Sequence, residues 1–411
     1  MKTESLLDNK QDCCGCRACE QKCPSKAIRM EPDAEGFIYP VIDEQSCVDC
    51  GICINVCPLK ENYRITNRLF EPVVYAVKHK DLETKRKSTS GGAFTALYSG
   101  FIAKGGVVYG VAIDKNTPLK IIHRRADSIQ ACEMFRGSKY VQSDTGDTFT
   151  QVRNDLKKGG SVMYVGTPCQ IAGLSSFLGI NGPKKYDNLL LVDILCYAVP
   201  SPLIWKEHIE YIEKKYKLRV IDYKFRSKRY GWRSHTEEVI FNNGRSLFKS
   251  MLSQSFAIFF ASRLVNRVSC SRCKFTGTVR PSDITLGDFW GIEKEIPEFK
   301  DNLGVSLMML NTVAGAGYFE EIKNCLHYKK SSVTQAFRKN HSKPSKTNPD
   351  RESFWIDYHR NGYEYVLNKY VGLNAHGKVK WYLKKYIKRL VNPEIRLRIS
   401  YLRSKMRMIA G

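Results

Sequence analysis

Eight of the fifteen cysteines stand in two runs near the amino terminus, and their spacing indicates a definite chemistry. Each run reads Cys-x2-Cys-x2-Cys-x3-Cys and is followed directly by proline. Three close cysteines can bind one face of a 4Fe-4S cluster, while the fourth, ahead of the proline, ligates the other cluster. The expected ligands are Cys13, Cys16, Cys19 and Cys57 for one cluster and Cys47, Cys50, Cys53 and Cys23 for the other.

Zinc is the alternative metal for such cysteines, because Cys-x2-Cys pairs also bind zinc. Two complete runs that both end in proline favour two 4Fe-4S clusters. Cys14 falls outside the repeat, and we expect it to be a bystander. Residues 13–58 therefore predict a two-cluster, ferredoxin-type module that transfers electrons.

Four further cysteines stand where a strand meets a helix or form a close pair. Residues 161–170 predict a strand, a turn and a helix with Thr167 as its cap, which places Cys169 in the first helical turn. Backbone N–H groups and the helix dipole favour a thiolate there. Cys196 directly follows an apolar strand at 189–195, and Cys270 and Cys273 form a Cys-x-x-Cys pair.

These four thiols suffice for a third 4Fe-4S cluster. On spacing alone a second interpretation is open, in which Cys169 and Cys196 are buried structural residues beside a redox or zinc pair at Cys270 and Cys273. Cys132 and Cys325 lie in amphipathic stretches and are expected to pack in the interior.

The elements that must position these cysteines suggest an α/β architecture. A chain of 411 residues is expected to form two or three domains. Apolar runs alternate with amphipathic helices from about residue 70 to 310, which predicts a mixed or parallel sheet covered on both faces. Ligands collect at the carboxyl ends of strands in such sheets. The predicted strands are 73–77, 106–113, 162–165, 189–195, 239–241 and 284–286. The predicted domains are 1–65, 70–325 and a basic helical region at 326–411.

The formal net charge of +25 is concentrated near the carboxyl terminus. Residues 378–407 hold eleven Lys or Arg and one acid, and they predict two amphipathic basic helices separated by Pro393. Such helices can lie on an anionic membrane surface or pack on the α/β domain. No nucleic-acid motif accompanies them. Without an apolar leader or an 18-residue apolar stretch, we expect a cytoplasmic protein, peripheral to the inner face of the membrane if the tail binds lipid.

Residues 10–310 resemble the beta subunit of the coenzyme F-420-reducing hydrogenases and dehydrogenases, a family that includes hydroxymethyl-chlorophyll reductases. The resemblance rests on motifs in a fixed order. They are Ser88-Thr-Ser-Gly-Gly-Ala-Phe, Gly137-Ser-Lys-Tyr-Val-Gln-Ser, Gly166-Thr-Pro-Cys-Gln, Cys196 with Val199-Pro-Ser-Pro, Cys270-x-x-Cys273 and Asp283-Ile-Thr-Leu-Gly-Asp-Phe-Trp-Gly. The resemblance implies FAD and a further 4Fe-4S cluster, and it favours a third cluster on Cys169, Cys196, Cys270 and Cys273.

The candidate flavin contacts fall in three segments. Residues 88–92 form a hydroxyl- and glycine-rich turn that opens a predicted helix and could offer N–H groups to a pyrophosphate; taken alone, it could equally be a helix cap. Residues 139–143 could present a cation, an aromatic face and amide donors, although without the family they would be read as a surface strand. The candidates are Ser88, Ser90, Gly91, Gly92, Lys139, Tyr140, Gln142, Ser143 and Thr167. No G-x-G-x-x-G fingerprint follows a strand, so a Rossmann NAD site is not supported.

The chain departs from the family at one position beside a cysteine. The family often has His-Gly after the residue that corresponds to Cys196, where this chain has Tyr197 and Ala198. An imidazole near a flavin could donate a proton, so its absence puts the family's substrate and proton route in doubt. The Tyr197 phenol could substitute, although we expect it to pack.

The resemblance implies an iron–sulfur flavoprotein oxidoreductase that passes electrons between ferredoxin-type clusters and FAD, with a small-molecule substrate that could be coenzyme F-420-like. A flavin links two-electron hydride chemistry to single-electron exchange. The alternative is a non-catalytic electron-transfer subunit that serves a partner dehydrogenase or hydrogenase. A third alternative is a membrane-associated accessory protein that has lost flavin chemistry. The expected partner is a redox protein or a small-molecule electron carrier.

Overall fold

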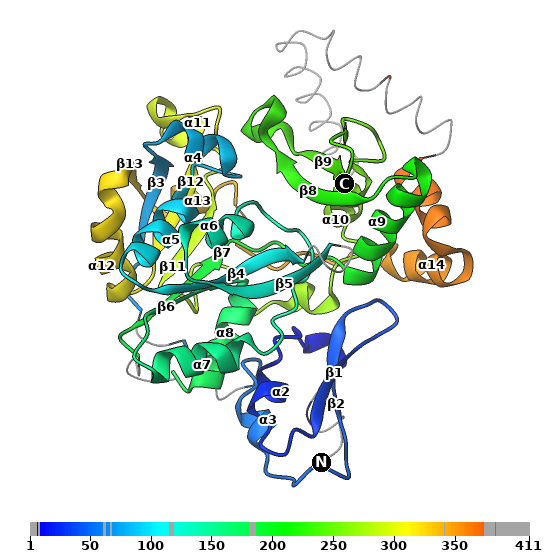
Figure 1. Cartoon of the computed structure of the whole chain (residues 1–411), viewed down its shortest axis with the longest axis horizontal. Helices are drawn as coiled ribbons and strands as arrows, with labels where there is room; N and C mark the ends of the chain where they lie inside the picture. The colour runs from blue at the N-terminus through cyan, green and yellow to red at the C-terminus, as the bar shows by residue number, and fades with distance from the viewer. Residues whose placement is uncertain are drawn as a thin grey trace, which may run out of the picture.

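The structure is a computed structural model that describes residues 6, 9–60, 63–65, 68–114, 119–180, 186–340, 342–373 and 383. A small amino-terminal head lies against a large sheet, and a second, smaller sheet with its own helices stands beside the large one (Figure 1). The predicted basic helices at 378–407 lie outside the described residues, apart from Leu383. In the described ranges, no helix combines the length and apolar character needed to span a bilayer.

The head contains one short helix for each cysteine run. Helix α2 (Ala18–Lys22) belongs to the first run and α3 (Ile52–Asn55) to the second. Strands β1 (Ile28–Pro32) and β2 (Ile38–Ile42) connect them as an antiparallel hairpin. Both helices begin after a residue with positive φ, Arg17 or Gly51, so the two runs follow a similar path. This two-fold arrangement is what the repeated cysteine spacing predicts.

The large sheet has eight strands in the order β13-β3-β12-β11-β7-β6-β4-β5. Its centre, β11-β7-β6-β4, is parallel, and the strands on either side of this centre pair with their neighbours antiparallel. The bounds are β3 Val73–His79, β4 Val107–Asp114, β5 Lys120–Ala126, β6 Val162–Gly166, β7 Leu189–Ile194, β11 Ile284–Asp288, β12 Ser306–Leu310 and β13 Leu326–Ser331. The mixed α/β class expected from the sequence is confirmed.

Helices cover both faces of this sheet. Helices α5 (Ala93–Ala103) and α12 (Val313–Ile322) bury their apolar residues against one face, together with the short α6 (Ile129–Cys132). Helices α7 (Thr148–Lys157) and α8 (Pro168–Leu178) cover the other face. The head packs into the same apolar cluster as α7 and α8. Farther along this face lie α11 (Ile292–Glu295) and α13 (Val333–Phe337).

The smaller unit is built from segments on either side of β11. Its sheet has the order β10-β9-β8, with β8 at Val220–Ser227, β9 at Thr236–Phe241 and β10 at Ser246–Phe248. Its helices are α9 (Pro202–Tyr216), α10 (Ser255–Ser262) and α14 (Arg351–Val366), which share one apolar core with β8 and β9. The region expected to be helical from residue 326 instead begins with β13 at the edge of the large sheet, and becomes helical only at α13.

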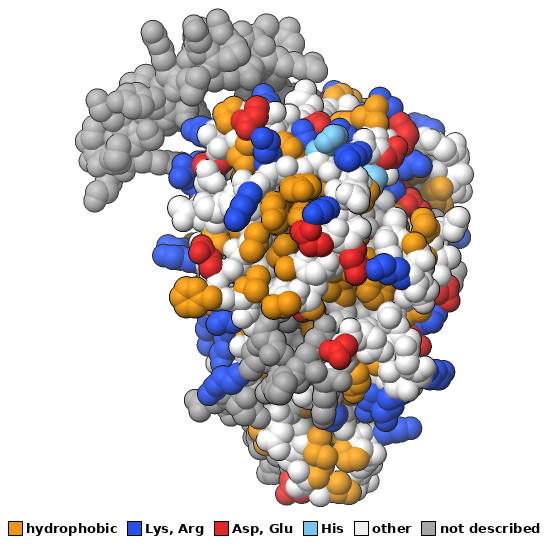
Figure 2. Space-filling model, turned by 90° about the vertical axis from the view of Figure 1, so that its left-hand side faces the viewer, with side chains coloured by type: hydrophobic (Ala, Val, Ile, Leu, Met, Phe, Trp, Pro, Cys, Tyr) orange, Lys and Arg blue, Asp and Glu red, His pale blue; other side chains and the backbone are white. Residues whose placement is uncertain are grey.

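The face on the side of β13 and α12 carries a mixed surface. Figure 2 shows apolar patches there, interspersed with both basic and acidic side chains. Across the described chain the most exposed large apolar residues are Phe70, Val313 and Val48. The positive charge of the protein therefore does not form a single basic field on this face.

Candidate functional site

The head cysteines gather in the two groups that the spacing predicts. The thiol of Cys57, from the second run, interacts electrostatically with the thiol of Cys13, from the first run. The thiol of Cys53 interacts in the same way with the thiols of Cys23 and Cys50. The fourth cysteine of each run therefore lies beside the other run. Burial raises the pKa of the Cys57 and Cys53 thiols, so without a metal these groups stay protonated.

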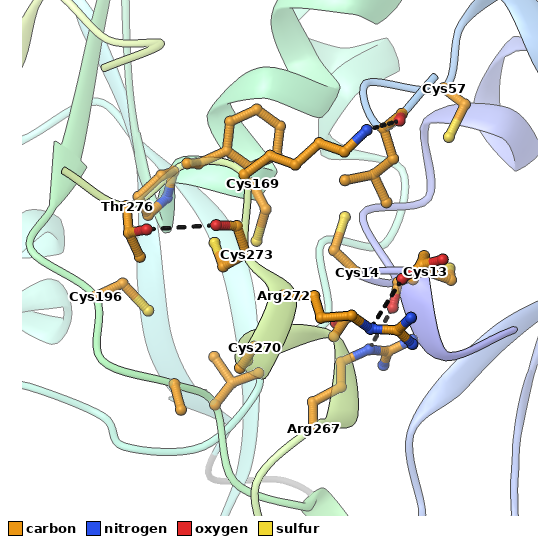
Figure 3. Close-up of a pocket in the computed structure, with 18 of the residues that line it drawn as sticks. Cys13, Cys14, Cys57, Cys169, Cys196, Arg267, Cys270, Arg272, Cys273 and Thr276 are labelled. Atoms are coloured by element: carbon orange, nitrogen blue, oxygen red, sulfur yellow. Dashed lines mark hydrogen bonds and ion pairs between the residues drawn. The ribbon is translucent and has the colours of Figure 1, made fainter. Parts of the chain in front are cut away.

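Four of the six cysteines beyond the head meet at one cavity of about 720 Å³ between the head and the large sheet. Figure 3 shows all four around it, together with cysteines of the head. The cysteines in the cavity wall are Cys169, Cys196, Cys270 and Cys273 from the sheet side, and Cys13, Cys14 and Cys57 from the head. The structure thus brings together residues that are 104 positions apart in the sequence, from Cys169 to Cys273.

Local structure sets the position of each of these four thiols. Cys169 lies in the first turn of α8, where Thr167 and Gln170 form a capping box; the Thr167 N–H donates to Gln170 Oε1 at 3.0 Å. Thr167 Oγ1 also lies 3.3 Å from Cys169 Sγ. The strand-to-helix turn expected here is confirmed, and Cys196 likewise follows the end of β7.

Cys270 and Cys273 lie at the turn of 3-10 helix Val268–Arg272, which packs beside the head. Burial raises the pKa of Cys270 to about 12 and that of Cys273 to about 11. The contact with Cys14 and partial burial raise the pKa of Cys169 strongly, and desolvation raises that of Cys196. Partly buried thiols that adjoin one another are a donor set suited to a soft, positively charged metal centre, which deprotonates the sulfur it binds.

Within the described ranges, no group of three or more His, Cys, Asp or Glu side chains is placed so that it could hold a metal ion.

Cys14, expected to be a bystander, lies between the two groups of cysteines. It is buried, and its thiol interacts with those of Cys16 and Cys169. It also lies in the wall of the cavity (Figure 3). The other two cysteines expected to pack do so, since Cys132 is buried under α5 and Cys325 packs at the edge of the same core.

The head is fixed to the sheet by hydrogen bonds to its backbone. Gln142 Nε2 donates to the Cys14 carbonyl at 3.0 Å, and Arg267 Nε donates to the Cys13 carbonyl at 2.8 Å. Helix α8 contacts the head directly: a Cβ atom built on Gly173 would lie 2.8 Å from Cys16 Sγ. Glycine is therefore required at this contact.

Two of the candidate flavin contacts take part in these internal bonds. Gln142 holds the head, and the Ser143 hydroxyl accepts a hydrogen bond from Gln170 Nε2 at 3.0 Å. Thr167 caps α8 beside Cys169. Gln142 and Thr167 contact the cavity-lining residues Cys14 and Cys169, whereas the 88–92 turn occupies a separate place next to β3 and β12.

The turn at 88–92 is closely packed. The Gly91 N–H donates to Ser306 Oγ at 2.8 Å, and a Cβ on Gly91 would lie 2.5 Å from the Val77 carbonyl oxygen. Gly92 has φ of +94°, a conformation that favours glycine. Both glycines are therefore required by the backbone path of the turn.

The segment before Lys139 packs against this turn. Arg136 Nη2 donates to Ser88 Oγ at 3.2 Å, and the Ser138 N–H donates to Thr89 Oγ1 at 3.1 Å. Lys139 Nζ donates to the carbonyl of Arg136 at 2.9 Å. Burial lowers the pKa of Lys139 to about 7.

Two cations from β8 and the turn after it complete this region, and sequence reasoning missed both. Lys228 Nζ donates to the carbonyls of Lys85 and Ser90 at 2.7 Å each, and burial lowers its pKa to about 7. Arg226 forms an ion pair with Asp288. No motif marks either residue, because only the packing of the smaller sheet against the 88–92 turn brings them there.

Three buried polar atoms around this turn have no hydrogen-bond partner: Ser90 Oγ, Arg136 Nε and Arg226 Nε. Unsatisfied buried polar groups are rare in native proteins and call for an explanation. One hydroxyl and two guanidinium nitrogens are donors suited to phosphate oxygens. The residues present therefore fit the anionic part of a dinucleotide such as FAD.

The fold and the cysteine groups together define an iron–sulfur electron-transfer protein. Residues 159–335 match the family model for the carboxyl-terminal part of the coenzyme F420 hydrogenase/dehydrogenase beta subunit, and residues 12–60 match that of the 4Fe-4S dicluster domain. The chain thus contains one segment similar to the dicluster domain and one similar to the carboxyl-terminal part of that beta subunit, in agreement with the resemblance found in the sequence. The first match includes all four cysteines of the sheet side, and the second includes all eight cluster cysteines of the head.

Curated relatives match a short stretch of the chain. One stretch of 48 residues is 40% identical to a subunit of the ion-translocating oxidoreductase complex of Methanosarcina acetivorans, a match to 12% of this chain and 16% of the relative. A stretch of 44 residues is 36% identical to the ferredoxin-type protein NapF of Haemophilus influenzae, which covers 11% of this chain and 25% of the relative. The chain therefore spans a quarter or less of these relatives.

Several chains of solved structures align with this chain, and one of them covers much of it. It is a xenon-derivatised F420-reducing NiFe hydrogenase complex from Methanosarcina barkeri. The alignment covers 73% of this chain and 91% of that chain, with 13% sequence identity and a TM-score of 0.45.

Proposed function

We propose that this protein is an iron–sulfur flavoprotein oxidoreductase that passes electrons between ferredoxin-type 4Fe-4S clusters and FAD to reduce or oxidise a small-molecule substrate. A coenzyme F420-like molecule is the first candidate substrate. The observation that carries the proposal is the cavity where Cys169, Cys196, Cys270 and Cys273 meet the head. Four thiols at one buried site, beside a two-cluster head, are the donor set of a third 4Fe-4S cluster.

The proposed FAD site lies at the 88–92 turn. Its residues are those around the unpaired donors, namely Ser88, Ser90, Gly91, Gly92, Lys139 and Tyr140, to which we add Arg136, Arg226 and Lys228. When bound, a flavin supplies hydride transfer as well as one-electron exchange. Lys228 and Lys139 place ammonium groups near the turn, and Gly91 and Gly92 allow the backbone path that the turn takes. Gln142, Ser143 and Thr167 remain candidate contacts on the cavity side.

A second candidate function is that of an electron-transfer subunit for a partner enzyme. It is favoured by the exposed end of the head, where Cys50 is exposed and Val48 is 66% exposed. A cluster at this end would be open to a redox partner protein. The curated relatives include a protein named as a subunit of an oxidoreductase complex. Turnover of a small substrate by the isolated chain with a chemical electron donor would exclude this alternative.

The site of action that we propose is the cytoplasm, where thiols stay reduced and clusters persist. The basic tail at 378–407 would then bring the protein to the inner face of the membrane. Vesicle co-sedimentation of the full chain, with and without this tail, tests the membrane contact.

Iron, sulfide and flavin analysis of anaerobically prepared protein tests the proposal. Three clusters predict about twelve irons per chain, and the FAD site predicts one flavin per chain. Cys196→Ala is expected to lose about four irons, whereas Cys132→Ala, a buried cysteine away from the cavity, is expected to lose none. Lys228→Ala is expected to lose flavin and keep iron. About eight irons and no flavin in the parent protein would contradict both the third cluster and the FAD site.

A further inference from the structure

Arg267 is a fully buried arginine at the contact between the head and the sheet. Its side chain is among the largest buried ones in the protein, with 2% of its surface exposed. It uses all three of its nitrogens: Nε donates to the Cys13 carbonyl at 2.8 Å, Nη1 to Gln142 Oε1 at 2.9 Å, and Nη2 to the Ile38 carbonyl at 2.9 Å. All three acceptors are uncharged.

The positive charge of Arg267 has no carboxylate beside it. The other well-buried arginines are paired, Arg280 with Asp193 and Arg226 with Asp288. In the part of the chain that the structure describes, no carboxylate lies within ion-pair distance of the Arg267 guanidinium. Transferring an unpaired charge into the interior is costly, so a buried cation without a counter-charge needs an explanation.

The ionisable groups around Arg267 are Tyr39 and cysteines from both sides of the cavity. The electrostatic neighbours of Arg267 include Cys13 and Cys14 in the head and Cys270 on the sheet side. Figure 3 shows Arg267 at the cavity wall, with its hydrogen bond to Cys13 and with Cys270 nearby. Tyr39 covers the guanidinium, with its ring centroid 4.3 Å from the central carbon.

We propose that Arg267 is the shared counter-charge of two clusters, the head cluster ligated by Cys13 and the third cluster ligated by Cys270, and that it raises the reduction potential of both. A 4Fe-4S cluster with four thiolates is anionic, and reduction adds one more negative charge. A fixed cation in a site that excludes water stabilises the reduced state more than the oxidised state. For the third cluster this inference rests on the proposed function, whereas for the head cluster it does not.

The guanidinium also holds the head in place by hydrogen bonds to its backbone. The test must therefore separate the effect of the positive charge from the effect of these hydrogen bonds. Arg267→Gln removes the charge and keeps an amide donor. Arg267→Lys keeps the charge and loses the forked hydrogen bonds. Gln142→Glu leaves Arg267 in place and sets a carboxylate at the position of Oε1, 2.9 Å from Nη1, but it gives up the Nε2 hydrogen bond to the Cys14 carbonyl. The two charge-neutralising variants differ in structure but are expected to act in the same direction.

Arg272 is the matched control. It is the last residue of the 3-10 helix Val268–Arg272, which Arg267 directly precedes, and it lines the same cavity, but its side chain is 46% exposed and it pairs with Asp12 at 3.3 Å. Water and the neighbouring carboxylate screen its charge. Arg272→Gln is therefore expected to shift the potentials much less than Arg267→Gln.

The experiment is a potentiometric titration of the full-length anaerobic protein followed by electron paramagnetic resonance, with iron and sulfide measured on each sample. Arg267→Gln and Gln142→Glu are expected to shift cluster potentials to more negative values, while Arg267→Lys stays near the parent. Unchanged potentials in both neutralising variants, or an equal shift in Arg267→Lys, would overturn the proposal.

Two other outcomes are decisive as well. If Arg267→Gln fails to retain iron, Gln142→Glu decides, because it keeps the arginine with its bonds to the Cys13 and Ile38 carbonyls and gives up only the bond from Gln142 to Cys14. If the parent holds about eight irons, the third cluster is refuted, and a shift confined to the head cluster still supports the role of Arg267 there. An eight-iron parent without any shift in Gln142→Glu would refute both.

Discussion

The buried ion pair between Arg280 and Asp193 ties together the two chain segments that carry the cavity cysteines, and its removal gives a quantitative prediction. Arg280 is 2% exposed and Asp193 is fully buried, with Nη2 and Oδ2 3.0 Å apart. The guanidinium also donates to the carbonyls of Ile194, at 2.8 Å, and Phe275, at 2.9 Å. It therefore links the end of β7, which leads to Cys196, to the loop after Cys273.

Replacing Arg280 by Met leaves the Asp193 carboxyl buried without its cation. Breaking a buried pair from one side costs about 3–5 kcal/mol. For a folding unit of 150–250 residues this is a fall of roughly 6–20 °C in melting temperature. Burial already raises the pKa of Asp193 against the opposing effect of Arg280. The loss of stability in Arg280→Met should therefore become smaller as the pH falls, because Asp193 then takes up a proton and no longer needs a cation.

The assay is thermal and denaturant unfolding of parent and variant at two pH values under anaerobic conditions. The control is Arg86→Met, which breaks a pair with Glu83 whose side chains are 56% and 61% exposed. Exposed pairs of this kind contribute about 0–1 kcal/mol. If Arg280→Met cost no more than Arg86→Met, the assignment of Arg280 as the link between the two cysteine segments would be refuted.

Two further predictions concern the smaller unit and the head contact. Burial raises the pKa of Glu237 to about 8, so its contribution to stability is present at low pH and is lost as the pH rises from 4.5 toward 8. The free energy of unfolding of Glu237→Gln, relative to that of the parent, should rise by roughly 1.4 kcal/mol per pH unit in this window. A difference in unfolding free energy that does not vary with pH would contradict the burial argument. Gly173→Ala should destabilise the head contact by about 1–3 kcal/mol and release iron, because the added methyl group meets Cys16. Gly317→Ala is the control, since this helical glycine has open space around it; equal iron loss in both variants would argue against the contact.

Short-range patterns in the sequence were enough for the parts of the fold that depend on local structure. The strands at 162–165 and 189–195 and the helix start at Thr167 follow from apolar runs and capping residues. Because parallel strands place their carboxyl ends at one edge, the meeting of Cys169 and Cys196 was also predictable. The order of the sheet was not, since β12 enters antiparallel between β11 and β3 and no local signal records that pairing.

The site residues that were missed depend on contacts between distant segments. Arg226 and Lys228 look like ordinary charges along a strand and a turn until the smaller sheet packs near the 88–92 turn. Arg267 has no motif at all, and its role becomes visible only when the head covers it. Gln142 was predicted from the sequence as a flavin contact, whereas in the structure its amide forms hydrogen bonds to the head and to Arg267.

Helix α8 carries Cys169 in its first turn and receives Cys16 of the head at Gly173. Four residues separate the two positions, a rise of roughly 6 Å along one rigid element. The head is therefore not a tethered module that must find its acceptor by diffusion. Exchange between the two cysteine groups would be a first-order process whose rate does not depend on protein concentration. A separately expressed head added to the remainder of the chain would have to rebuild this contact in every encounter, and its rate would then saturate with concentration.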